Sequence, residues 1–132
     1  MPEKVRWSTS VEVQNGPTFN LGGVMQSDAY AKIRVDVQPG EDEAVSILPS
    51  GVAAKFLLVR ASKYVDATDA GKKLTYAVGS ASETDLSGPI VLTDAAVLSL
   101  LGSDLTEVTF KNGMTELVTV EILVCRDAGP TA

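Results

Sequence analysis

The fold class is decided by residues 4–14, KVRWSTSVEVQ, and by residues 31–38, AKIRVDVQ, which alternate polar and apolar side chains. Successive side chains of a β-strand point to opposite faces, so each stretch predicts a strand with one face on a core and the other in water. Half-buried strands of this kind are typical of antiparallel sheets, whereas parallel sheets need apolar residues on both faces. The two stretches therefore predict an all-β protein.

Turn signals divide much of the remaining chain into short segments. Asn15-Gly16-Pro17, Pro39-Gly40 and Gly88-Pro89 interrupt the apolar runs. Turn signals about 8 to 12 residues apart are typical of sandwiches and barrels. Residues 18–25, which contain the pair Gly22-Gly23, are expected to form a loop or a short, bulged edge strand.

One helix and one fully covered strand complete the expected architecture. Residues 94–101 favour a short helix, because Ala and Leu dominate them and Thr93 or Asp94 can cap the first turn. Residues 52–60 are apolar on both sides of the strand, which indicates that both faces are covered. We predict a single β domain, residues 1–132 with short tails at 1–3 and 128–132, folded as an antiparallel β-sandwich or flattened barrel of about seven to nine strands.

The last two strands, residues 104–110 and 114–126, are expected to pair as a hairpin around Asn112-Gly113. A two-residue turn would place Phe110 opposite Thr115, whereas a three-residue loop places it opposite Met114. A one-residue slip exchanges the two faces of a strand, so burial favours the second register. That register puts the large apolar side chains of both strands on one face: Val108, Phe110, Met114, Val118, Val120, Ile122 and Val124.

The charge balance argues against nucleic acid and membrane as partners. The chain has 11 Lys and Arg, 17 Asp and Glu and no His, which gives a formal net charge of −6. A nucleic-acid surface needs a basic patch, and the only adjacent basic residues are Lys72-Lys73. The N-terminus lacks a signal-peptide pattern, and no stretch approaches the roughly 18 to 20 apolar residues that span a bilayer. We therefore expect neither partner.

The single cysteine, Cys125, excludes an internal disulfide. Disulfides are rare in reducing compartments, so this usage favours assembly in a reducing cytoplasm. A free cysteine in an apolar strand behaves as a small, inert hydrophobic residue. We therefore expect Cys125 to have a packing role only.

The groups that most enzymes and metal sites use are missing. Without histidine the chain lacks the commonest general acid/base and the usual zinc and iron ligands. Calcium needs about six converging oxygens, and a glycosidase cleft needs aromatic residues, which make up only 5% of the chain. We therefore predict no catalytic site, no cofactor and no metal, and interpret three acidic groups as solvated surface: residues 41–43, Asp66 with Asp69, and Glu83 with Asp85 and Asp94.

Two apolar surfaces are candidates for contact with other subunits. Trp7 lies on the apolar side of the first strand, and we predict that it packs in the core rather than forming an exposed binding platform. The outer face of the last strand mixes leucines with polar residues, which suggests that it is covered. The predicted assembly interface joins the first strand to this outer face: Val5, Trp7, Val11, Val13, Leu117 and Leu123.

The final segment reads VTFKNG at 108–113, VTVEILV at 118–124 and RD at 126–127, after strands rich in Val, Ala, Thr and Ser. In these segments and in the composition of its strands, the chain resembles small virion proteins of tailed bacteriophages: capsid decoration or cement proteins, and β-domain components of tails and baseplates. The resemblance implies a non-enzymatic virion protein that forms a homo-oligomer such as a trimer and contacts a major capsid or tail protein. The alternative, suggested by Trp7 and by Asp66 with Asp69, is a carbohydrate- or calcium-dependent binding module.

Overall fold

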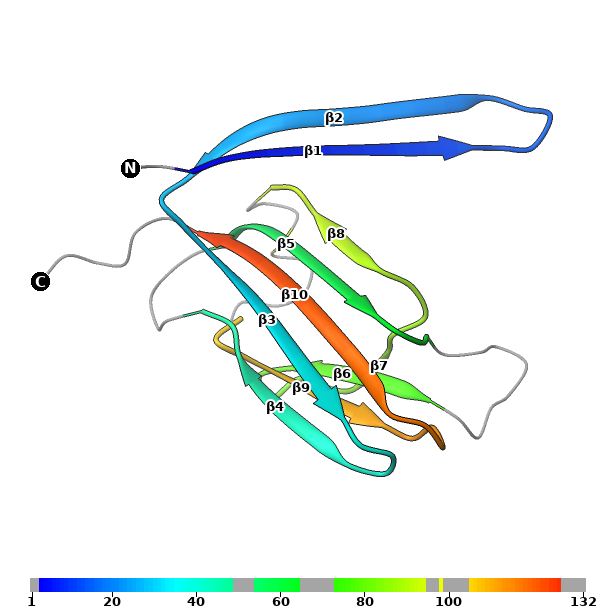
Figure 1. Ribbon diagram of the computed structural model, residues 1–132, viewed down its shortest axis with the longest axis vertical. Coiled ribbons are helices and arrows are strands. Elements are labelled where there is room, and N and C mark those ends of the chain that lie inside the picture. The colour runs from blue at the N-terminus through cyan, green and yellow to red at the C-terminus, as the bar shows by residue number, and fades with distance from the viewer. Residues whose placement is uncertain (1–2, 49–53, 65–72, 95–97, 99–104, 127–132) are drawn as a thin grey trace, which may run out of the picture.

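The computed structural model describes residues 3–48, 54–64, 73–94, 98 and 105–126 (Figure 1). Strands in this part of the chain form two four-stranded sheets and a separate two-stranded hairpin, and every pairing is antiparallel. The predicted all-β, sandwich-like fold is confirmed. The strands are β1 (Glu3–Glu12), β2 (Thr18–Ser27), β3 (Ala29–Val37), β4 (Asp42–Ser46), β5 (Ala54–Ala61), β6 (Leu74–Val78), β7 (Thr84–Asp85), β8 (Ile90–Leu92), β9 (Glu107–Asn112) and β10 (Val118–Arg126).

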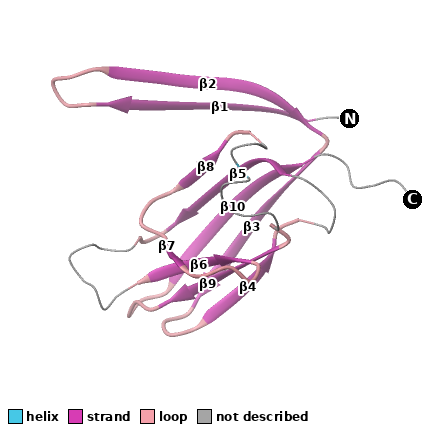
Figure 2. Ribbon diagram, turned by 180° about the vertical axis from the view of Figure 1, so that it is seen from behind, coloured by secondary structure: helices cyan, strands magenta, loops and turns pink. Residues whose placement is uncertain are grey.

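The sandwich consists of one sheet in the order β3-β10-β5-β8 and a second in the order β4-β9-β6-β7. The β1–β2 hairpin lies beyond the first sheet, on the side away from the second (Figures 1 and 2). Apolar side chains from both sheets fill the space between them, and aliphatic residues dominate because the chain has few aromatic ones. The most deeply buried members of this core are Val37, Leu57, Leu74, Leu86, Phe110, Val118, Val120, Ile122 and Val124.

Strand β3 has the two faces that its alternating sequence predicts. Ala31, Ile33 and Val35 pack against the core and Val37 is fully buried, whereas Lys32, Arg34 and Asp36 between them are exposed. The neighbouring strand β10 continues the same inward face, since its register places Ile122 beside Ile33 and Val120 beside Val35. The inward faces of these two strands form the middle of the core.

The predicted hairpin between the last two strands is wrong. β9 pairs with β4 and β6 in one sheet, whereas β10 pairs with β3 and β5 in the other. The chain crosses between the sheets after Asn112, and the predicted inward side chains still face the core, but from opposite sides of it. The predicted pairing of the two strands was therefore wrong, but the prediction of which side chains are buried was correct for Val108, Phe110, Val118, Val120, Ile122 and Val124.

The side chain of Asn112 explains the crossing. It is fully buried, its Nδ2 donates to the carbonyl oxygens of Val37 at 2.9 Å and Glu116 at 2.8 Å, and its Oδ1 accepts from the Met114 N–H at 2.8 Å. Gly113 follows where a Cβ would lie 2.9 Å from the Lys73 carbonyl oxygen. A tight two-strand turn would leave the polar side chain of Asn112 without these partners, and a buried unpaired amide is destabilising.

Three further expectations concern residues 18–25, the helix and the N-terminal tail. Residues 18–25 are neither loop nor bulge, because all of them belong to the regular strand β2, which pairs with β1 without a register shift. The predicted helix at 94–101 lies mostly outside the described residues; within it, the buried Leu98 donates its N–H to the Asp94 carbonyl at 3.0 Å. The expected tail at 1–3 is shorter, since Glu3 already pairs with Ser27.

Candidate functional site

The β1–β2 hairpin has one apolar face that nothing in the described structure covers at its tip. The register pairs Val11 with Phe19 and Thr9 with Leu21, so these side chains lie on the same face. Val11, Phe19 and Leu21 are exposed by 50%, 57% and 56%. Water therefore contacts a row of large apolar side chains along the outer half of the hairpin.

The same face is covered nearer the base of the hairpin. Val5 and Met25, which pair with each other, and Trp7 are half-buried, whereas Lys4 and Gln26 on the opposite face are exposed. Burial on one face only indicates that the hairpin turns its apolar face toward the sandwich at its base. Farther out the hairpin and the sandwich lie apart (Figures 1 and 2).

Trp7 does not belong to the sandwich core, so its predicted core position is wrong. It pairs with Gly23 on the neighbouring strand, where a Cβ would meet the indole Nε1 at 3.0 Å. The glycine leaves room for the indole to lie flat on β2, which is the close approach that a glycine in a strand permits. The Gly22-Gly23 pair, interpreted from the sequence as a break, instead accommodates the tryptophan.

Ser27 holds the base of the hairpin in a defined position. Its hydroxyl is buried, accepts from the Arg126 N–H at 3.0 Å, and donates to the carbonyl oxygens of Ala29 at 2.6 Å or Arg126 at 2.8 Å. Lys55 Nζ also donates to the Gln26 carbonyl oxygen at 3.4 Å. These bonds join β2, β3, β5 and β10 at one corner, so the direction in which the hairpin projects is fixed by the sandwich.

A second apolar surface lies on the outer face of the β3-β10-β5-β8 sheet. The register aligns Leu123, Leu58 and Val91 across three strands, with Lys32 at the β3 end of the row. Leu123 and Leu58 are half-buried and Val91 is 42% exposed. This row crosses three of the four strands of the sheet.

The next row on the outer face, toward the base of the hairpin, is buried in part. Phe56 pairs with Cys125, and both are almost fully covered, whereas Tyr30 on the other side of Cys125 is 57% exposed. Burial raises the pKa of the Cys125 thiol by desolvation of its charged form. The thiol is therefore kept neutral and unreactive, as expected for a packing residue.

The structure divides the predicted interface residues between these two surfaces. Val5, Trp7 and Val11 lie on the apolar face of the hairpin, Val13 is exposed in its turn, and Leu123 lies in the outward row of the sheet. Leu117, just before β10, is 43% exposed. Phe19 and Leu21 were missed because residues 18–25 were interpreted as a loop or a short, bulged edge strand; their own alternation before Gly22-Gly23 was the available signal.

The acidic groups do not converge where they are described. Asp42 lies beside Lys111 across the strand pair, Glu43 is half-buried beside Phe110, and Glu83 is 3.9 Å from the Lys111 ammonium. No group of three or more potential metal ligands forms among the described residues. Asp66 and Asp69 lie outside them, so the suggested calcium loop stays a prediction.

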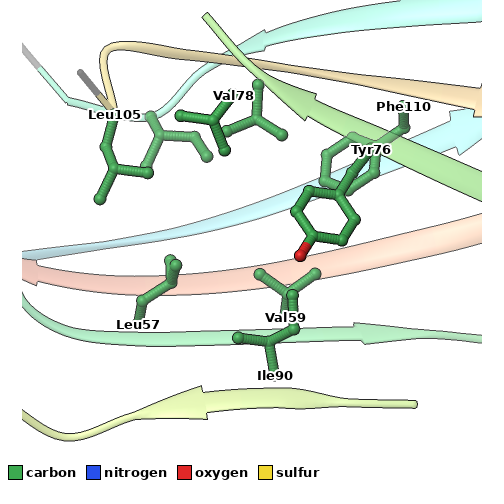
Figure 3. A pocket seen from close by; sticks show the side chains of 9 residues that line it. Leu57, Val59, Tyr76, Val78, Ile90, Leu105 and Phe110 are labelled. Atoms are coloured by element: carbon green, nitrogen blue, oxygen red, sulfur yellow. The ribbon is translucent and has the colours of Figure 1, made fainter. Parts of the chain in front are cut away.

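Two hollows lie at the side of the sandwich near β8. The first is an apolar slot of about 10 Å³ between the sheets, into which the Tyr76 hydroxyl points toward Val59 and Ile90 (Figure 3). That volume is about the minimum for one water molecule, so the slot is a packing defect rather than a ligand site. The second is a shallow depression of about 320 Å³ beside Tyr76, and among its lining residues Asp85 is the one carboxylate.

Comparison with known proteins adds no family to this geometry. The sequence matches no protein-family model and no curated protein sequence. Within the described residues, no helix has both the length and the hydropathy needed to cross a bilayer. The two apolar surfaces are therefore the features on which a functional proposal rests.

Proposed function

We propose that this chain is a non-enzymatic structural component of a bacteriophage virion, either a capsid decoration protein or a tail subunit, that holds a symmetric assembly together. The observation that supports it is the projecting hairpin, whose apolar face is bare at Val11, Phe19 and Leu21. Its proposed partners are further copies of itself and a major capsid or tail protein.

The physical argument starts from the weakness of an isolated hairpin. A two-stranded hairpin is at best marginally stable in water, and ten-residue strands with a bare apolar face gain little from folding alone. Contiguous exposed apolar side chains are candidates for contact sites between proteins. The fixed base at Ser27 presents the hairpin in one direction, which reduces the entropy lost when it meets a partner.

Symmetry allows a small contact of this kind to stabilise a whole particle. One hairpin offers a small area, but an assembly repeats the contact in every subunit, so weak individual contacts add up to a durable particle. The virion setting is supported by the resemblance to small phage structural proteins in residues 108–127 and in the composition of the strands. An acidic, histidine-free β domain is compatible with that role, since it needs surface shape rather than reactive groups.

Mass spectrometry of density-gradient-purified virus particles from the biological source of the sequence tests the proposal. We expect the chain in the particle fraction at a fixed copy number relative to the major shell or tail protein. Treatment with high salt provides a control for loosely adsorbed protein, because contacts that bury apolar surface persist at high ionic strength. A chain that is confined to the particle-free fraction would overturn the proposal.

A further inference from the structure

Of the edge strands that the structure describes, β2 is the one without the usual protection against pairing with a further strand. The β1–β2 sheet has two strands, so each has an unpaired outer edge. Natural proteins protect such edges with charged side chains, proline, bulges or short strands. Strands β1, β3 and β4 carry at least two charged residues each, and β7 and β8 have two and three residues. The ten residues of β2 include no charged residue, no proline and no register shift, so its edge is open to strand addition.

The register of the hairpin shows which backbone groups of this edge are free. Val13 donates its N–H to the Pro17 carbonyl oxygen at 3.0 Å, so these two residues form a hydrogen-bonded pair. Since hydrogen-bonded and non-hydrogen-bonded pairs alternate along an antiparallel ladder, the even-numbered residues of β2 turn their N–H and C=O groups to the outer edge. At the ends of this edge, Gly16 donates its N–H within the turn, and the Gln26 carbonyl oxygen accepts from Lys55 Nζ at 3.4 Å. Within the described contacts, both groups are free in four residues: Thr18, Asn20, Gly22 and Val24.

We propose that β2 of one copy pairs with β2 of a second copy, antiparallel and about a two-fold axis at Leu21. The four residues with free groups are symmetric about Leu21, so Thr18 lies opposite the second copy's Val24 and Asn20 opposite its Gly22. Four such pairs exchange two hydrogen bonds each, about eight in all, which is within the number of direct hydrogen bonds in a typical specific interface. This inference deepens the proposed function and rests only on its self-association; it does not require the virion.

The same register brings the bare apolar side chains of the two copies together. Directly opposite residues of a ladder point to the same side, so the odd-numbered residues of both strands share one face. Leu21, 56% exposed in one copy, meets Leu21 of the second, and Phe19, 57% exposed, lies opposite the second copy's Gly23. The indole of Trp7 lies on Gly23, so Phe19 meets an aromatic ring there. The strand complements itself both in hydrogen bonding and in apolar surface, and this self-complementarity selects a second copy as the partner.

The hairpin can make this contact as it stands. Over its outer half, β1 lies between β2 and the sandwich in both views, so the edge of β2 faces away from the sheets (Figures 1 and 2). The bonds of Ser27 to Ala29 and Arg126 at the base stay in place. Two hairpins joined at β2 form one four-stranded sheet with the order β1-β2-β2-β1. A sheet of three or more strands with an apolar face has the stability that a lone hairpin lacks.

Light scattering across a concentration series tests the pairing with two proline variants. Asn20 and Ser10 lie opposite each other in a non-hydrogen-bonded pair, so each turns its N–H to the outer edge of its own strand. Proline at either position removes that N–H and spares the bonds between β1 and β2. We expect Asn20→Pro to weaken self-association at least tenfold and Ser10→Pro to leave it unchanged, with folding checked by the thermal transition at low concentration. A monomer at every concentration, or equal loss in both variants, would overturn the inference.

Cross-linking tests the register in a Cys125→Ala background, which removes the native thiol. Leu21 and Val24 are both 56% exposed, but the two-fold axis places only Leu21 opposite itself. Opposed Cα atoms of such a pair lie about 4.5 Å apart, within the reach of a disulfide, whereas the two copies of Val24 lie about 20 Å apart. With oxidised glutathione as the oxidant, we expect Leu21→Cys to form a covalent dimer and Val24→Cys to stay monomeric on a denaturing gel. Equal cross-linking of both variants, or of neither, would overturn the proposed register.

The two proposals fail separately. A chain that is monomeric in solution but present in virus particles would overturn the pairing of the β2 strands and leave the proposed function standing. A chain that pairs as described but is absent from particles would do the reverse.

Discussion

The β1–β2 hairpin and the sandwich are made from the same kind of strand but are stabilised in different ways. β1 and β3 both alternate polar and apolar residues almost without error, yet Ile33 and Val35 of β3 lie against a core whereas Val11 of β1 lies in water. The apolar inward faces of the sandwich strands lie opposite a second sheet. The hairpin has one only at its base. Alternation thus fixes which side chains share a face, but not what covers that face.

Replacing one phenylalanine in each region gives the largest expected contrast. Phe110 is buried between the sheets and Phe19 is mostly exposed on the hairpin. We expect Phe110→Ala to lower the free energy of unfolding by about 3 to 5 kcal/mol, because it leaves a cavity in the core. Phe19→Ala should change it by about 0.5 kcal/mol or less at concentrations where the chain is monomeric. Urea unfolding measures both, and similar losses would contradict the contrast.

A pair of asparagines should give the next largest difference. Asn112→Ala removes three hydrogen bonds at the crossing between the sheets and leaves the buried Val37 carbonyl without its partner. We expect a loss of about 2 to 4 kcal/mol in unfolding free energy. Asn20, exposed on the polar face of the hairpin, serves as the control, and Asn20→Ala should be nearly neutral. A small effect at Asn112 would show that another group fixes the crossing.

A smaller effect is expected where the two regions join. Ser27→Ala removes the bonds between the base of the hairpin and β10, at a cost of about 1 to 2 kcal/mol. We also expect faster amide hydrogen exchange in β1 and β2 than in the wild-type chain, because the hairpin loses its anchor. Ser10→Ala, on the exposed part of β1, should change neither quantity. Unchanged hairpin exchange in Ser27→Ala would mean that other contacts hold the base.

The smallest effect concerns pH. The pKa of Cys125 is raised by burial, so the folded chain keeps the thiol proton at a pH where the unfolded chain has released it. Stability from this group is therefore complete below the ordinary pKa of a thiol and is lost as the pH rises through the raised value. We expect wild-type protein to lose more unfolding free energy between neutral and strongly alkaline pH than Cys125→Ala. Equal losses in the two proteins would contradict the assignment.

Local sequence patterns predicted most strands and the inward side chains, because the alternation within a strand shows which of its side chains share a face. The same patterns failed where contacts with residues distant in the sequence determine the structure. Asn112-Gly113 reads locally as a hairpin turn, but the partners of Asn112 include Val37, 75 residues away. The Gly22-Gly23 pair reads as a break, but Trp7 on the neighbouring strand makes use of Gly23. Whether an apolar face is exposed depends on what packs opposite it, and the sequence of one strand does not show this. For the hairpin, the residues identified from the sequence were therefore only Val5, Trp7, Val11 and Val13.

The central claim is the proposal that another copy covers the bare face of the hairpin, whereas the two sheets of the sandwich cover each other's inward faces. Amide hydrogen exchange at a low and a high protein concentration tests it most directly, because exchange reports local opening strand by strand. We predict that β1 and β2 exchange quickly when the protein is dilute and slowly when it is concentrated, while β10 stays protected in both. Hairpin exchange that does not change with concentration would contradict the account.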